Sequence, residues 1–135
     1  MLRHQIINSL LAESTGKVAD AAIYAWERLA TQIISIVGED GFNSLYARSL
    51  FLSQSKFPWL AASQFPPQID HRFAGLKASL EGQAPAQASE ANRLLLITFT
   101  DILASLIGEQ LTTRILSLAW DTDISNSTGT EFKNE

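Results

Sequence analysis

The chain has 135 residues, of which 46% are hydrophobic and only 18% are charged, and its formal net charge is −4. This length fits one domain with a hydrophobic core, and the absence of cysteine excludes disulfides, thiolate metal sites and thiol nucleophiles. The basic residues do not cluster, so the sequence predicts no nucleic-acid partner. No apolar run is long enough to span a bilayer and no secretory signal is recognisable, so we expect a cytoplasmic protein without a membrane partner.

Apolar residues recur at helical spacing along nearly the whole chain, and no stretch alternates strictly as a half-buried strand would. We therefore predict an all-α protein, a bundle of five to six helices in a single domain over residues 1–121. A short helix is expected over residues 3–13, and a long one over residues 17–37 carries two apolar stripes. A helix with two apolar stripes is contacted from two sides, so this one should be central.

Glycine and proline divide the middle of the chain. Gly38 is expected to end the long helix in a left-handed conformation, and a third helix should then run to about residue 53. Prolines in a connector over residues 54–67 interrupt regular structure, because proline lacks the backbone N–H donor and fixes φ. A short amphipathic helix is expected from Ile69 to about residue 81.

The last third of the chain carries the most apolar helix, predicted over residues 86–107 with only a narrow polar stripe. This helix and the one over residues 17–37 are expected to pack against each other as the two long central helices of the bundle. A sixth helix is predicted over residues 110–120. Residues 122–135 are acidic and rich in Ser, Thr, Asn and Gly, a composition that predicts a disordered tail.

One short sequence occurs twice at an offset of 70 residues. Ser-Ile-Val-Gly-Glu at positions 35–39 matches Ser-Leu-Ile-Gly-Glu at positions 105–109, and a helix of about 20 residues precedes each copy. This pattern is typical of an internally duplicated helix-Gly-Glu-helix unit. The alternative is that a glycine followed by an acidic residue is a common way to end one helix and begin the next, and that the match is coincidental.

Asp101 is the carboxylate that stands out, because its helix is otherwise almost entirely apolar. A charge in such surroundings must either reach solvent or find a cationic partner. One interpretation is a buried ion pair with Arg48 or Arg114. The other is a solvated outer stripe that Asp101 shares with Thr98 and Ser105.

Aromatic residues supply candidate interface positions. Phe57, Trp59 and Phe65 lie in the proline-rich connector, and aromatic side chains on irregular segments often anchor protein–protein interfaces. Alternatively, they fold back and close one end of the bundle. Trp26 and Trp120 lie on apolar helix faces and are expected either in the core or in an interface.

Neither histidine lies in a spacing that binds metal. However, the segment His71-Arg72-Phe73-Ala74-Gly75 resembles the histidine phosphotransfer motif, in which an apolar residue, a lysine and a glycine follow the histidine at the second, third and fourth positions. The resemblance implies that His71 is a phosphoacceptor in a helical signalling domain. Ala74 replaces the lysine that stabilises the phosphate, and the resemblance covers five residues only.

Several segments together are similar to a group of small, uncharacterised all-helical bacterial proteins. They are GEDGFNSLYARS at 38–49, FPWL at 57–60, IGEQLTTR at 107–114 and AW at 119–120. The resemblance implies a compact helical domain and carries no activity.

The sequence shows no catalytic residues and implies no cofactor, so we expect a protein that is not an enzyme. The low charge content indicates that part of the surface is covered by another chain. We therefore predict a regulatory or protein-interaction module, with a homodimer as the expected assembly. Two alternatives remain: a histidine phosphotransfer domain that uses His71, and a carrier of a small apolar ligand between the helices.

Overall fold

The computed structural model describes residues 3–12, 18–63 and 73–120, and within these ranges every regular element is a helix. The prediction of an all-α bundle is therefore confirmed. No described helix is both long enough and apolar enough to cross a membrane. The predicted tail over residues 122–135 lies outside the described residues. The helices are α1 (Arg3–Ala12), α2 (Val18–Ser53), the 3-10 helix η1 (Pro58–Ser63), α3 (Ala74–Glu81), α4 (Pro85–Ile107) and α5 (Glu109–Trp120).

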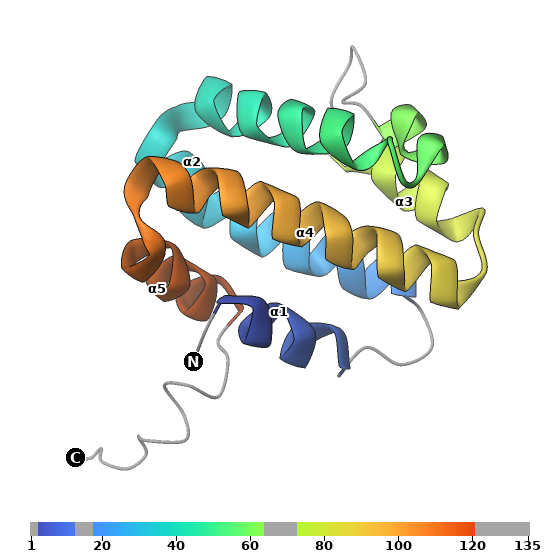
Figure 1. The fold of residues 1–135 in the computed structure, drawn as a ribbon, viewed down its shortest axis with the longest axis horizontal. Coiled ribbons are helices and arrows are strands. Elements are labelled where there is room, and N and C mark those ends of the chain that lie inside the picture. Colours follow the sequence, from blue (N-terminus) through green and yellow to red (C-terminus); the bar gives the residue numbers. More distant parts are fainter. Residues whose placement is uncertain (1–2, 13–17, 64–72, 121–135) are drawn as a thin grey trace.

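Two glycines turn the chain back on itself at the same end of the bundle (Figure 1). Gly38 divides α2 into a first arm, residues 18–37, and a second arm, residues 39–53. Gly38 has a positive φ of 84°, as a left-handed residue does, but its ψ of 168° is extended. The prediction of a left-handed conformation is therefore wrong in the value of ψ. Gly108 joins α4 to α5 with nearly the same angles, φ 98° and ψ 154°. Only glycine commonly adopts this backbone region, because a Cβ would clash there.

The first arm of α2 and α4 pack side by side and run in the same direction through the middle of the bundle (Figure 1), which confirms the predicted pair of long central helices. The indole Nε1 of Trp26 donates a 2.8 Å hydrogen bond to Oδ1 of Asn92, and the ring also meets Phe99 edge-on at 5.3 Å. Each helix contributes a stripe with alternating spacings of four and three residues, as in paired helices. We call these the central stripes: Ala22, Trp26, Leu29, Ile33 and Ile36 in α2, and Asn92, Leu96, Phe99, Leu103 and Leu106 in α4.

The duplicated sequence corresponds to a duplicated structure of two helix–glycine–helix units: the first unit is α2, and the second unit is α4, Gly108 and α5. Ser35 Oγ donates to the Gln32 carbonyl at 2.7 Å, and Ser105 Oγ donates to the Ile102 carbonyl at 2.6 Å, so even this local bond recurs. Buried residues also recur at the offset of 70 across both joints. The buried pairs are 22/92, 25/95, 26/96, 29/99, 30/100, 33/103, 42/112, 45/115, 46/116, 49/119 and 50/120.

The remaining helices cover opposite sides of this double unit. On one side α1 packs against α4 and α5 and buries Ile6 and Ile7. On the other, α3 packs against α2 and η1. The fourth helix was expected to begin at Ile69, but α3 begins at Ala74, and residues 64–72 lie outside the described part. Under α3 lies an aromatic cluster made of Trp26, Phe42, Tyr46, Phe73 and Phe99.

Candidate functional site

The central stripes stay buried until the last turn before each glycine, where both become exposed. Ile33 and Leu103 are fully buried, whereas one stripe position further on Ile36 is 49% and Leu106 is 67% exposed. The chain turns back immediately afterwards at Gly38 and Gly108, so this last turn of each stripe lies at the rim of the bundle. Two large aliphatic side chains in equivalent positions therefore face solvent at one end.

Residues next to these two in the chain, and in the first turn of α5, are also apolar and partly exposed. Val37 is 36% and Leu111 is 43% exposed, and Ile107 is partly buried against the core. A Cβ placed on either glycine would meet nothing within 4 Å, so the backbone there is open to an approaching molecule. We define the glycine end as residues 36–41 and 106–111, at the end of the bundle where α2 bends and α4 passes into α5 (Figure 1).

The charge of the glycine end is negative. Glu39, Asp40 and Glu109 directly follow the glycines, where the N-terminal dipoles of the second arm and of α5 also favour acidic residues. Residues 29–47 and 94–113 contain no lysine or arginine. The exposed apolar side chains are consequently bordered by acidic residues from both units.

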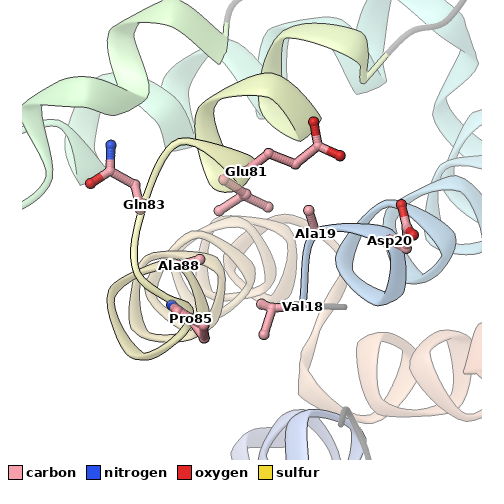
Figure 2. A pocket seen from close by; sticks show the side chains of 8 residues that line it. Val18, Ala19, Asp20, Glu81, Gln83, Pro85 and Ala88 are labelled. Atoms are coloured by element: carbon pink, nitrogen blue, oxygen red, sulfur yellow. The ribbon is translucent and has the colours of Figure 1, made fainter. Parts of the chain in front are cut away.

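A groove lies at the opposite end of the bundle, between the first turns of α2 and α4 (Figure 2). Its volume is about 320 Å³. Figure 2 shows Val18, Pro85 and Ala88 grouped between the helices, while the carboxylates of Asp20 and Glu81 stand at the border. The groove is lined by Val18, Ala19, Asp20, Leu80, Glu81, Gln83, Pro85 and Ala88.

A second hollow of about 450 Å³ runs alongside, between α2 and α3, and shares Glu81 with the groove. Lys77 of this hollow forms an ion pair with Asp20 of the groove, with 3.3 Å between Nζ and Oδ1. Glu27 adds a further acid to the lining. Both hollows therefore combine apolar walls with a mainly acidic border.

The predicted buried ion pair of Asp101 is wrong. The Asp101 side chain is 51% exposed, and its Oδ1 lies 3.3 Å from Nε2 of His4 on α1. Arg48 and Arg114 are both exposed as well. Because the carboxylate keeps its hydration, the structure agrees with the alternative of a solvated stripe.

Two of the five predicted interface aromatics belong to the core of the single chain. Trp26 is fully buried, and Trp120 is buried with its Nε1 donating to the Ala25 carbonyl at 2.9 Å, so of the two positions expected for them, core or interface, both residues occupy the core. Phe57 and Trp59 pack against the core while parts of their rings remain exposed, and their ring centroids are 5.8 Å apart. Phe65 lies outside the described residues.

The phosphotransfer motif is described only in part. His71 and Arg72 lie outside the described residues, whereas Phe73 is fully buried and Ala74 begins α3. Within the described ranges no three His, Asp or Glu side chains gather as metal ligands. Burial raises the pKa of the Tyr46 phenol far above its usual range, because the phenolate would lose its hydration.

Sequence reasoning missed the exposure at the glycine end. Ile36 and Leu106 continue apolar helical stripes, and stripe spacing alone does not show where the covering helices stop. The available signal was the glycine two residues after each of them, which marks the end of the paired region. Comparisons with known protein families, curated proteins and solved structures found no match for this chain.

Proposed function

We propose that this protein is a non-enzymatic protein-interaction module that binds its partner through the glycine end. One observation carries the proposal: the two central stripes, buried elsewhere, end in the exposed aliphatic side chains of Ile36 and Leu106. Exposed apolar side chains bordered by polar residues are typical of protein interaction sites.

The remainder of the central pair supports this interpretation. Its stripe positions are filled by packed aliphatic and aromatic side chains, and the buried polar residue Asn92 accepts a hydrogen bond from the buried Trp26. A recognition surface at the end of such a rigid pair requires no internal movement to bind. Binding therefore costs little conformational entropy in this protein.

The test is affinity capture from the source cell with the double variant Ile36→Ser/Leu106→Ser. The matched control is Phe51→Ser/Leu118→Ser, which removes apolar side chains of similar exposure, 68% and 60%, at least ten residues along the chain from either glycine. We expect the glycine-end variant to lose the partner by about tenfold or more, because truncating central apolar contacts costs about 1–2 kcal/mol or more. Equal capture by both variants would contradict the proposal.

Carriage of a small ligand is a second candidate, favoured specifically by the groove between the first turns of α2 and α4. Its volume falls within the range of small-molecule pockets. Native mass spectrometry of the purified protein should then show a co-purifying molecule that Val18→Trp, which fills the groove, removes. An unmodified mass in both proteins would exclude this second candidate.

A further inference from the structure

We infer that the partner at the glycine end is a single amphipathic helix with lysine or arginine flanking its apolar face, and not a second copy of this chain. This inference rests on the proposed function and specifies the chemistry of its partner. It is argued from three features of the glycine end: the sign of its charge, the extent of its apolar area and its two-sided construction.

The sign of the charge selects a basic partner. Glu39 and Asp40 border the apolar side chains on one unit, and Glu109 borders them on the other. The basic residues nearest in sequence to the glycine end are Arg48 in the second arm and Arg114 in α5, and both lie outside residues 36–41 and 106–111. Flanking cations on a partner would meet carboxylates on both sides, and complementary rims of this kind speed association and fix orientation.

The same charges disfavour a second copy. Two glycine ends facing each other across a twofold axis would place the Glu39, Asp40 and Glu109 carboxylates of one chain near those of the other. Like charges brought together in an interface cost free energy, by several kcal/mol when they are juxtaposed closely.

The apolar area is also small for a stable dimer. The exposed aliphatic side chains here are those of Ile36, Val37, Leu106 and Leu111, each smaller than an aromatic side chain and about half exposed. Together they offer less than about 400 Å² of apolar surface. A standard protein–protein interface buries about 800 Å² on each partner. A helix that docks by three or four anchor residues spaced over two to three turns needs much less area.

The two-sided construction suits a helix. Ile36 and Val37 come from one central helix and Leu106 and Ile107 from its parallel neighbour, with the open backbone of Gly38 and Gly108 beside them. An apolar helix face can rest on both pairs at once, while its flanks reach the acids of the two units. Each unit thus supplies half of the same binding surface.

The experiment uses fluorescence anisotropy with three labelled peptides of about 18 residues, or five helical turns. The first has a leucine face flanked by lysine, the second has the same face flanked by glutamate, and the third is a scrambled lysine peptide without an apolar face. We expect the first to bind at least tenfold more tightly than either of the others. Its affinity should fall as salt is added, because the flanking charges become screened.

Charge reversal by Asp40→Lys/Glu109→Lys should lower the affinity for the lysine peptide by about tenfold and raise the affinity for the glutamate peptide. The matched control, Glu27→Lys/Glu81→Lys, makes the same change of net charge on α2 and α3 away from the glycine end. That control should leave the preference for the lysine peptide unchanged.

The outcomes separate this inference from the function on which it rests. If Ile36→Ser/Leu106→Ser abolishes a dimer seen by light scattering, or if the scrambled peptide binds as well as the amphipathic one, the inference is overturned while a partner-binding role for this surface stands. If neither peptide binding nor partner capture responds to Ile36→Ser/Leu106→Ser, the proposed function itself fails.

Discussion

The two units of the duplication share their backbone path but differ in what fills the space around the second helix. In the first unit, Phe42 and Tyr46 of the second arm join the aromatic cluster covered by α3. Their counterparts in the second unit are Thr112 and Leu116, which are also buried but carry no ring. The side of the bundle that holds them is covered by α1, which buries Ile6 and Ile7.

The comparison shows which features define the unit. The glycine joints and the spacing of buried positions recur, whereas the volume of individual side chains does not. Helical cores accept different residues provided that the pattern and the total volume are kept. The path of the chain is thus fixed by backbone conformation at Gly38 and Gly108 and by stripe spacing, and each unit completes its core with a different covering helix.

Hydrogen bonds between elements also differ. Two side-chain bonds connect the first arm to α5 of the second unit: Arg28 donates from Nε to the Ala119 carbonyl at the C-terminus of α5, and Trp120 donates from Nε1 to the Ala25 carbonyl. At the offset of 70 the two donors are not repeated: Thr98 corresponds to Arg28, and Leu50, which has no side-chain donor, corresponds to Trp120. Polar bonds thus hold α5, while aromatic packing holds the second arm.

The largest difference is expected from truncating equivalent core positions. Phe42→Ala should lower the free energy of unfolding by about 3–5 kcal/mol, because it leaves a cavity among Tyr46, Phe73 and Phe99. Thr112→Ala should cost only about 1 kcal/mol, the net value of its bond to the Gly108 carbonyl. Urea unfolding followed by tryptophan fluorescence measures both. Equal losses would show that the two units are packed alike.

The glycine joints should instead respond equally. Gly38→Ala and Gly108→Ala should each cost about 1–3 kcal/mol, because both residues hold a backbone conformation that a side chain disfavours. The control is Gly82→Ala, whose φ of −79° and ψ of −2° suit alanine and whose Cβ would make only ordinary contacts. That change should be neutral or slightly stabilising. A large loss at one joint alone would argue against equivalent joints.

The first unit, which contains Tyr46, should also make the free energy of unfolding depend on pH. The pKa of Tyr46 is raised in the folded state, so above pH about 10 only the unfolded chain ionises this phenol. Stability should therefore be independent of Tyr46 ionisation at neutral pH and should fall by about 1.4 kcal/mol per pH unit above pH 10. Tyr46→Phe should remove this part of the decrease in alkaline unfolding curves. Leu116, the counterpart, has nothing to ionise.

The smallest effect is expected at the polar attachment of α5. Arg28→Ala should cost less than about 1 kcal/mol, because the arginine is exposed and its bond to the Ala119 carbonyl competes with water. Amide hydrogen exchange should reveal the change more clearly: relative to the wild type, Arg28→Ala should speed exchange at the C-terminal turn of α5 more than in the second arm. Arg48→Ala, at an exposed position of that arm, serves as the control. Unchanged exchange in α5 would contradict the role of Arg28.

Much of this architecture could be predicted from the sequence, because helices and joints depend on local signals. Apolar spacing indicated the two long helices, and Gly38 and Gly108 indicated both joints. The position of Asp101 relative to other helices could not be predicted, since its contact with His4 spans 97 residues and depends on how α1 docks. The burial of Trp26 and Trp120 likewise depends on which helices surround them.

The surface at the glycine end shows the same limit. The stripe that contains Ile36 and Leu106 was predictable, but their exposure depends on how far the neighbouring helices extend in three dimensions. The ψ values at the glycines also follow from the path of the returning chain, which a glycine permits but does not specify.

The most direct test of the account is a backbone amide NMR titration of the intact protein with the lysine-flanked peptide. We predict that chemical-shift changes concentrate at residues 36–41 and 106–111 and that both groups saturate along one binding curve, because the two units form one surface. Changes confined to one unit, or centred on the groove around Val18 and Pro85, would contradict a shared site at the glycine end.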